Sequence, residues 1–395
     1  MINLLIPIAR RPPGKLGVVL LVGCLSFPTT FTAGSNDHRV TVAVLGLFRP
    51  ERIDVSIAQD AIVTMRKGSA DIRQVLASGQ CLHVESRGDQ LRISFFESDG
   101  RLLLGHSADA VRTEETVCTL SVPGRIRRDF FGRLEVKARD GLLLPRITVK
   151  EEFAVQQILQ SEMADVQQTE ALRSQAVLVR GYLRTSKGRH QKDGYDFCDT
   201  THCQFFTEFK SLAGRFNQAA GDTEGFVVTF LGKPIQPLYT AVCGGRTLAG
   251  FADRHEPKEG SGYPFRTVSC RFCVRHPLFA WETKVETQEL IRILQDESGR
   301  DPAEILASLA VPEDNGESGT LKQAVRIRVG RALGWNIIRS NRYSVDVHSN
   351  LVKVRGHGSG HNFGLCQAGA IEMSRQGMSM KEILSFYFPG CSIGR

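Results

Sequence analysis

The residues best suited to chemistry lie between Ile158 and Tyr182, where two helical patterns meet. One carboxylate, Glu162, stands at the break between them, and the polar residues Gln175 and Arg180 follow on the second pattern, which is otherwise apolar. A carboxyl group among apolar residues can be kept protonated, as a general acid requires. An acid at a helix terminus is also often only a cap or a solvated side chain. The spacing alone therefore leaves both interpretations open.

A polar loop after the second helical pattern contains side chains of the types that bind zinc. The four candidate ligands are His190, Cys198, His202 and Cys203. Imidazole and thiolate groups suit a tetrahedral zinc ion, and such a site could be structural. The spacing is not that of a standard zinc finger. A disulfide between the two cysteines, with both histidines solvated, is the competing interpretation.

A glycine-rich loop, residues 356–364, precedes a predicted helix. It does not predict a nucleotide site, because no long βαβ unit surrounds it. Its glycines are expected to let the backbone turn tightly and bring His361 and Gln367 towards a groove. Cys366 lies five residues after His361, so the two could form a nucleophile and its base. No third group that would orient such a pair is evident.

Residues 1–33 predict an exported protein. A basic segment precedes a short apolar run, residues 16–25, and small residues follow it. The run is too short to span a bilayer, which needs roughly 20 residues. Either Cys24 lies in a lipoprotein signal box and carries a lipid, or the chain is secreted after cleavage near Gly34. The expected location is the periplasm, the cell wall or the outer surface.

The charge and the cysteine content bear on the protein's partners and on its disulfides. The formal net charge is +8, and the leader holds three of the basic residues and no acidic ones, so its removal leaves +5. Without Lys/Arg blocks, this charge argues against a nucleic-acid partner. Ten cysteines in an exported chain predict disulfides. Cys81 with Cys118 is the simplest pairing.

The remaining pattern predicts an α+β protein with an N-terminal β-rich module, residues 39–130, and a mixed catalytic domain, residues 131–395. Apolar and polar residues alternate clearly in residues 91–95 and 133–137, as in half-buried strands. The mixed domain is expected to contain a helix pair and two hairpins. One helix is predicted from Glu151, and a second from Thr169 as N-cap, with Gly181 and the basic residues 187–190 as its stop signals. Further helices are predicted over residues 287–295, 302–309, 321–333, 365–375 and 380–388, and hairpins over residues 225–239 and 343–354.

Several short motifs follow one another in a fixed order over residues 130–395. They are residues 133–136 with Phe153, Ser161-Glu162-Met163, residues 171–176 with Arg180 and Tyr182, residues 197–204, Gly244-Gly245-Arg246-Thr247, Gly358-x-Gly360-His361, Gln367-x-Gly369-Ala370 and Tyr387-Phe388-Pro389-Gly390. Each is modest alone, but in this order they resemble the stage II sporulation protein D / amidase-enhancer family of bacterial cell-wall proteins.

Members of this family whose activity is understood are lytic transglycosylases that act on peptidoglycan glycan strands, especially strands stripped of peptide stems. The resemblance implies that Glu162 is the essential acid. It implies zinc in some members, held here by His190, Cys198, His202 and Cys203, and no organic cofactor. Candidates for binding sugar hydroxyl and acetamido groups are Gln175, Arg180, Tyr182, Arg246, His361 and Gln367.

The chain departs from the family pattern at several positions. Ala164 replaces the usual proline, and Cys243 and Cys366 replace serines. Together with Cys270 and Cys273, these cysteines would form local bridges or a second metal site.

Other relatives are described only as amidase enhancers. The alternative function is therefore a non-catalytic cell-wall protein that enhances an amidase, and a further alternative is a hydrolase using Cys366 or the metal. The sequence leaves open whether the cell-wall role belongs to sporulation, division or turnover.

Overall fold

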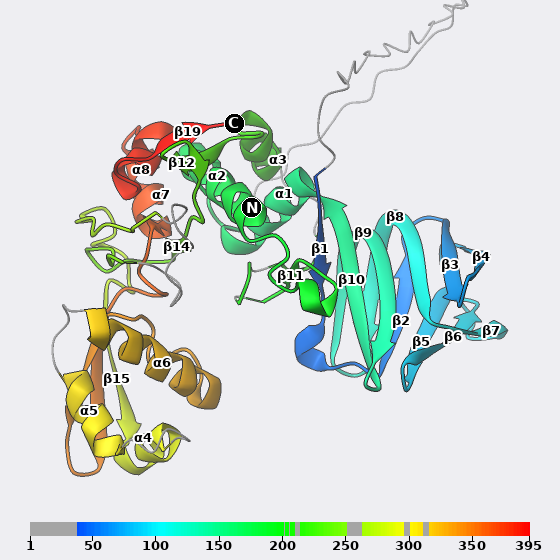
Figure 1. The fold of residues 1–395 in the computed structure, drawn as a ribbon, viewed down its shortest axis with the longest axis horizontal. Helices are drawn as coiled ribbons and strands as arrows, with labels where there is room; N and C mark the ends of the chain where they lie inside the picture. The colour runs from blue at the N-terminus through cyan, green and yellow to red at the C-terminus, as the bar shows by residue number, and fades with distance from the viewer. Residues whose placement is uncertain are drawn as a thin grey trace, which may run out of the picture. The chain divides into compact units, whose positions relative to one another are not determined.

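The β-rich pattern folds into an eleven-stranded sheet in the computed structural model of the protein (Figure 1). Residues 38–200, 202–204, 206–209, 214–250, 263–295, 301–310 and 316–395 are described. The predicted signal segment, residues 1–33 with Cys24, lies outside them. The strands are β1 (Arg39–Ala43), β2 (Arg52–Ile57), β3 (Ala61–Lys67), β4 (Ala70–Leu76), β5 (Cys81–Arg87), β6 (Gln90–Phe96), β7 (Leu102–Ala108), β8 (Ala110–Val122), β9 (Ile126–Arg139), β10 (Leu142–Lys150) and β11 (Phe197–Cys198).

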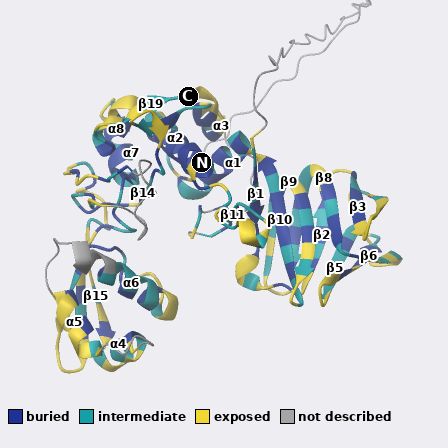
Figure 2. Ribbon diagram, viewed as in Figure 1, coloured by how far each residue is buried: buried dark blue, intermediate teal, exposed yellow. Residues whose placement is uncertain are grey.

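The sheet follows the order β11-β1-β10-β9-β8-β2-β5-β6-β7, and β3 pairs with both β8 and β4. Alternate residues of most strands are buried, as Figure 2 shows. The register aligns these residues, because Val55 of β2 lies opposite Leu82 of β5, which lies opposite Phe95 of β6. Side chains on one face of a sheet pack together in this way. The alternation predicted over residues 91–95 and 133–137 is confirmed.

The boundary predicted between residues 130 and 131 falls inside strand β9, and the sheet continues to Lys150. Helix α1 (Glu151–Glu162) begins at the next residue. From Asp37 to Arg395 the chain forms one unit by its internal contacts. The sheet and the helix that ends at Glu162 are therefore one continuous piece of chain.

The predicted Cys81–Cys118 disulfide is wrong. Cys81 lies opposite Ser56 and Cys118 opposite Ile57, on the two sides of strand β2. Consecutive residues of a strand face opposite sides of a sheet, so the two thiols point to different faces, and two strand spacings (about 10 Å) separate them. A disulfide needs about 4.4–6.8 Å between Cα atoms. All nine cysteines within the described ranges are free thiols.

A group of helices packs around α2 (Thr169–Thr185), which contacts α1, α3 (Gly214–Asp222), α7 (Gln367–Arg375) and α8 (Met380–Tyr387). Of the two predicted stop signals, Gly181 is wrong, because it lies inside the helix, whereas the end at Thr185 falls just before the basic residues 187–190. Gly181 serves as a contact point instead, since an added Cβ would lie 3.0 Å from Pro237. The predicted N-cap, Thr169, is the first helical residue, and α3 was not predicted.

The same part of the chain contains two small sheets of short strands. β12 (Val227–Phe230) pairs with β13 (Lys233–Pro234), as the predicted hairpin requires, and with the C-terminal β19 (Ser392–Gly394). β14 (Tyr239–Thr240) pairs in parallel with β18 (Leu365–Cys366). The β12–β19 and β14–β18 pairs join segments that are more than a hundred residues apart.

A second lobe has its own hydrophobic core. Its sheet has the order β15 (Ala280–Glu286), β17 (Leu351–His357), β16 (Tyr343–Val347), and its helices are α4 (Thr287–Leu294), α5 (Pro302–Ala310) and α6 (Gly316–Leu333). The predicted helices and hairpin of this region are confirmed. The α+β class predicted for the chain is confirmed as well.

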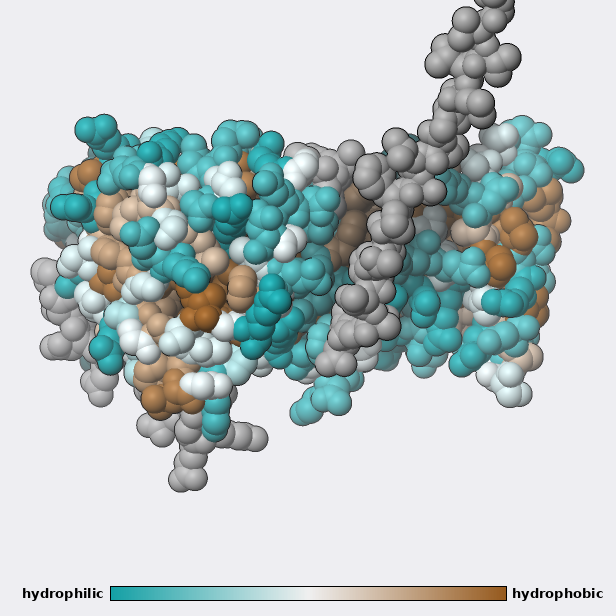
Figure 3. Space-filling view, turned by 90° about the horizontal axis from the view of Figure 1, so that it is seen from above, coloured by the Kyte–Doolittle hydropathy of each residue, from teal (hydrophilic) through white to brown (hydrophobic). Residues whose placement is uncertain are grey.

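The surface seen in Figure 3 mixes hydrophilic and hydrophobic side chains. Single large apolar residues such as Leu47, Leu231 and Val274 are exposed. In the part of the chain that the structure describes, no helix combines the length and apolar character needed to cross a bilayer.

Arg180 lies at the centre of the helical group and is fully buried. Its guanidinium binds Glu152 through two nitrogens, at 2.6 and 2.7 Å, and donates to the carbonyls of Phe226 and Ala220. One arginine therefore ties α2 to α1 and to the end of α3. Such bidentate pairs are the strongest charge-assisted hydrogen bonds.

Replacing Arg180 by Met should lower the free energy of unfolding by about 3–5 kcal/mol, because the carbonyls of Phe226 and Ala220 and the Glu152 carboxylate would all lose their buried donor. Urea denaturation measures the change. Arg355→Met is the matched control. Arg355 also pairs with a glutamate, Glu282, but the two side chains are 55% and 44% exposed, so a much smaller loss is expected. Equal losses in the two variants would contradict a structural role for the buried pair.

Candidate functional site

Glu162 is the last residue of α1 and is partly buried. The turn before it is held against residues 206–209. The Thr207 N–H donates to the Ser161 hydroxyl at 3.1 Å, and the Gln157 side chain donates to the Thr207 carbonyl at 2.8 Å. These contacts fix the end of the helix and therefore the start of the Glu162 side chain.

Tyr239 of β14 is the meeting point of the site. Its hydroxyl donates to Gln204 Oε1 at 2.8 Å. Burial, then the charge of Glu162 and then Tyr182, raise the pKa of Tyr239 well above its ordinary value, while a contact with Gln175 lowers it. Three predicted site residues therefore lie in the neighbourhood of one phenol. Tyr239 was not predicted as a site residue. The only sequence signal for it is its place in a short strand before the Gly-Gly-Arg motif.

Two glutamine side chains of the site have unused hydrogen-bonding capacity. Gln175 is fully buried, and neither of its amide atoms has a partner of good geometry among the described residues. The same holds for Nε2 of Gln367, the first residue of α7. Buried polar groups are nearly always paired, so unpaired ones indicate a missing water or ligand. Both amides are therefore candidates for binding a polar ligand.

His361 links the glycine-rich loop to Tyr239. Its Nδ1 accepts the Phe363 N–H at 3.1 Å, and the ring also bonds the backbone of Tyr239. Burial lowers the pKa of His361 to about 4, so the ring is neutral near pH 7. With these backbone contacts, His361 holds the loop against β14. It does not form the nucleophile–base pair with Cys366, whose sulfur accepts the N–H groups of Cys243 and Gly369.

The glycines of this loop allow close backbone contact, as predicted. Gly358 and Gly364 have positive φ angles, 81° and 67°. A Cβ would lie 2.3 Å from the Val242 carbonyl at Gly358 and 2.1 Å from the Leu238 carbonyl at Gly364. The loop therefore clasps the segment that carries β14 on both sides, which no larger residue would permit.

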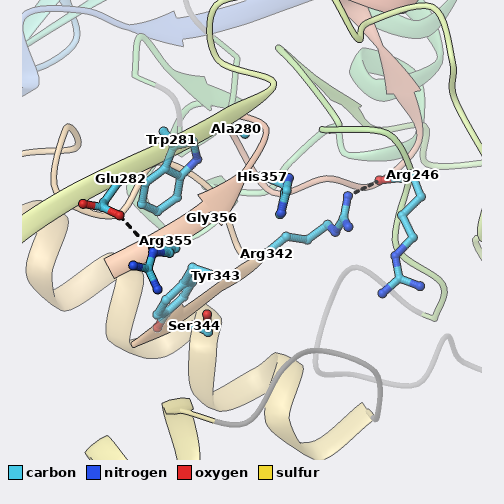
Figure 4. Close-up of a pocket in the computed structure, with 10 residues that line it drawn as sticks. All are labelled: Arg246, Ala280, Trp281, Glu282, Arg342, Tyr343, Ser344, Arg355, Gly356 and His357. Carbon is cyan, nitrogen blue, oxygen red and sulfur yellow. Dashed lines mark hydrogen bonds and ion pairs between the residues drawn. The ribbon is translucent and has the colours of Figure 1, made fainter. Parts of the chain in front are cut away.

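Arg246 lies in a different place from the Tyr239 group. It lines a pocket of about 720 Å³, and no other predicted site residue is part of the lining (Figure 4). Arg342 fixes this turn, since its guanidinium donates to the carbonyls of Cys243, Gly244 and Arg246 at 3.0, 2.9 and 3.3 Å. Trp281 and Arg355 line the same pocket from the second lobe.

The four predicted zinc ligands come together as the His/Cys loop cluster: His190, Cys198, His202 and Cys203. Their donor atoms all lie within 4.8 Å of one another. His190 Nε2 is 3.3 Å from Cys203 Sγ, and His202 Nδ1 is 3.7 and 3.6 Å from the two sulfurs. Zinc bond lengths with tetrahedral angles predict separations of about 3.3–3.8 Å between donors. The donors fit one tetrahedral ion, and both cysteines are free thiols rather than a disulfide.

The surroundings of the His/Cys loop cluster favour a deprotonated thiol and an oriented histidine, as metal binding requires. A hydrogen bond with the Cys203 thiol lowers the pKa of Cys198 to about 3, and the same contact raises the pKa of Cys203. The Asp193 carboxylate lies 3.7 Å from His190 Nδ1. A carboxylate behind the second nitrogen is the usual support of a metal-binding histidine.

The His/Cys loop cluster is tied both to the sheet and to the site. Cys198 pairs with Ala43 of β1, and the Asp199 carboxylate accepts the Leu45 N–H at 2.9 Å. Gln204, which accepts the Tyr239 hydroxyl, directly follows Cys203. An ion bound by the loop would therefore help to hold Gln204 beside Tyr239.

The remaining predicted ligand-binding residue, Arg180, is placed in the interior. All its described contacts are with Glu152 and backbone carbonyls, so its geometry supports a structural role. Tyr182 is also buried, with its ring 6.0 Å from that of Phe197. Substrate binding by these two residues stays a prediction.

The fold and the site together define an α+β protein in which a sheet leads into a buried helix pair that presents one carboxylate beside a His/Cys loop. Residues 146–230 match the family described as stage II sporulation protein, SpoIID. The resemblance found in the sequence is confirmed by this match to the SpoIID family. The match indicates a role related to the cell wall.

Two relatives extend the match beyond that segment. An uncharacterized protein of Brachyspira hyodysenteriae (strain ATCC 49526 / WA1) is 27% identical over 244 residues, which cover 60% of this chain and 65% of the relative. Stage II sporulation protein D of Bacillus subtilis (strain 168) is 22% identical over 261 residues, which cover 60% of this chain and 72% of the relative. The match thus spans slightly less than two-thirds of the first relative's length.

The burial of His361 predicts a pH dependence of stability. Its pKa is about 4 in the fold and about 6.5 when unfolded. Between these values the unfolded chain binds the extra proton, so this stabilisation is complete above pH 6.5 and is lost as the pH falls to 4. The loss should be at most about 3 kcal/mol. Urea denaturation at several pH values should show it in the wild type but not in His361→Gln. The exposed His348→Gln control should behave as wild type, and a His361→Gln curve parallel to wild type would contradict the assignment.

Proposed function

We propose that this protein is a peptidoglycan lytic transglycosylase that cleaves glycan strands, especially strands stripped of peptide stems. The observation that carries the proposal is that Glu162, Gln175 and Tyr182 all lie near enough to Tyr239 to shift the pKa of its hydroxyl. It combines one candidate acid with unpaired amide groups that suit sugar hydroxyl and acetamido groups. The family's cell-wall role supplies the substrate class.

In the proposed reaction, Glu162 begins as a neutral acid. It protonates the glycosidic oxygen that joins N-acetylmuramic acid to the next sugar, and the bond from C1 to this oxygen breaks. The resulting carboxylate accepts the proton of the muramic acid C6 hydroxyl as that oxygen bonds to C1. The product is an anhydro sugar, and no water is consumed. The carboxyl group returns to its protonated form.

A single carboxylate suffices for this reaction. Glycosidases that activate water or form a covalent intermediate use two carboxyl groups roughly 5–9.5 Å apart. The other two carboxylates of α1, Glu151 and Glu152, bind Arg184 and Arg180. They are engaged in packing the helices, which supports the assignment of both acid and base roles to Glu162.

The position of Glu162 also suits an acid. It ends a helix, where the partial negative charge of the carbonyl groups opposes a further negative charge. Tyr239, kept protonated by its surroundings, can donate a hydrogen bond but carries no competing charge. Gln175 and Gln367 would orient the acetamido groups, and Arg246 would bind a more distant part of the strand.

We propose that the His/Cys loop cluster binds a structural zinc ion. When bound, the ion would supply a rigid crosslink between His190, which follows α2, and the loop over residues 198–203. The chain's own contribution is positional, since Gln204 and Thr207 extend from this loop to Tyr239 and to the turn before Glu162. The protein would work in the exported compartment, and Cys24 would anchor it if lipidated.

Glu162→Gln should abolish formation of anhydro-sugar product from denuded glycan strands, with a loss of about 10²–10⁴-fold in rate. Mass spectrometry of the digested strands measures it. Asp165→Asn is the matched control, because Asp165 is exposed and only three residues away; it should retain wild-type activity. Both variants should unfold at wild-type urea concentrations.

Wild-type activity in Glu162→Gln would refute the mechanism. Binding of glycan strands without any product, together with stimulation of a partner amidase, would instead establish the non-catalytic alternative. Loss of activity with a chelator but not with Glu162→Gln would indicate a metal hydrolase.

The double variant His190→Ala/Cys203→Ser should lose one zinc ion per chain and unfold at a lower temperature, because the loop loses its crosslink. Metal analysis and thermal unfolding measure the two effects. Cys391→Ser, which changes a partly buried free thiol outside the cluster, should change neither quantity. Glu162→Gln should keep its zinc. Full zinc content in the double variant would contradict the site.

A further inference from the structure

A second group of thiols lies outside the His/Cys loop cluster. We call it the four-cysteine cluster: Cys243, Cys270, Cys273 and Cys366. All four are buried, and their sulfurs lie within 4.8 Å of one another. They come from three segments of chain, one between β14 and the Gly-Gly-Arg turn, one with a Cys-x-x-Cys spacing, and one at the start of α7.

The sulfur separations identify the kind of site. Cys273 Sγ lies 3.6 Å from Cys243 Sγ and 3.9 Å from Cys270 Sγ. Four zinc–sulfur bonds of about 2.3 Å in a tetrahedron predict separations of about 3.8 Å. A disulfide would bring two sulfurs to about 2.05 Å. A cluster of several iron ions would hold its cysteine sulfurs farther apart, around a larger inorganic core. The spacing therefore fits a single ion.

The surroundings can balance the charge of four thiolates around a divalent ion. Cys366 is the N-cap of α7, and its sulfur accepts the N–H groups of Gly369 and Cys243, both at 3.3 Å. The partial positive charge of a helix N-terminus stabilises a thiolate. The Tyr387 hydroxyl lies 3.1 Å from Cys270 Sγ, within hydrogen-bond distance. The Arg342 guanidinium bonds the Cys243 carbonyl and brings a full positive charge close to the group.

The backbone is also shaped for this arrangement. Gly369 lies in the first turn of α7, where an added Cβ would lie 2.9 Å from Cys270 Sγ and 2.0 Å from the Tyr387 hydroxyl. A larger residue would push these two groups out of place. The Cys270 N–H donates to the Gly245 carbonyl at 2.8 Å, which fixes the Cys-x-x-Cys segment against the Gly-Gly-Arg turn.

We propose that the four-cysteine cluster binds one structural zinc ion through four thiolates, in addition to the ion of the His/Cys loop cluster. Zinc suits the site because soft thiolates in tetrahedral geometry select it. The ion would crosslink the turn that carries Arg246 and the N-terminus of α7, which carries Gln367. The inference concerns metal binding and does not depend on the proposed reaction.

The wild-type chain, purified without added metal, should contain two zinc ions and no stoichiometric iron. Cys270→Ser/Cys273→Ser should contain one, and His190→Ala/Cys203→Ser should also contain one, as metal analysis measures. Cys118→Ala is the matched control: it removes a buried thiol outside both clusters and should leave two ions bound.

Cobalt substitution gives a second measurement. It reports the ligands of the ions that remain bound, so a variant that loses part of its metal can still be read. The sulfur-to-cobalt absorption per ion should be about twice as strong in His190→Ala/Cys203→Ser, which keeps four thiolate ligands, as in Cys270→Ser/Cys273→Ser, which keeps two. Zinc content in Cys270→Ser/Cys273→Ser equal to that of the wild type would overturn the proposal. So would iron in place of the second zinc, or an intact mass lower by one hydrogen per cluster cysteine, which would show disulfides.

Discussion

The short parallel pairing of β14 with β18 is the contact on which the site depends. It joins Tyr239 to Leu365, residues that lie far apart in the sequence. The side chain of Tyr239 meets the residues of α1 and α2, and its backbone meets His361. Helix α2 already joins α1 to α7, and this pair adds the strand that carries Tyr239 to the same arrangement. A two-residue strand can carry this role because glycines let the neighbouring loop clasp it closely.

The helices obtain their rigidity from a different source. α2 is buried along most of its length, and a charged residue, Arg180, sits at its centre. Burying an arginine is costly unless its charge and its donors are all satisfied. Glu152 and two carbonyl groups satisfy them. These partners come from α1 and from the residues at and beyond α3. The contacts of Arg180 therefore favour the arrangement of these elements in which α1 ends at Glu162.

Much of the local structure could be predicted from the sequence, because periodicity and turn residues act over short distances. The strands of the sheet, the helices of the second lobe and the candidate acid were found this way or through the family motifs. The failures concern contacts between distant segments. The face on which Cys81 and Cys118 point depends on pairing with β2, and the partner of Arg180 lies 28 residues earlier. Tyr239 was missed for the same reason, since its role exists only where four segments meet.

The chain enters and leaves the second lobe at two neighbouring points. Ala280, at the start of β15, lies directly opposite His357, at the end of β17, and the lobe between them has a core of its own. The two ends of this segment are as close as neighbouring strands allow, about 5 Å. In topological terms the lobe is an insertion whose two ends are joined by the pairing of β15 with β17. A change in the size of the lobe would therefore leave the pairing of β14 with β18 in place, but it would alter the pocket that Trp281 and Arg355 line beside Arg246.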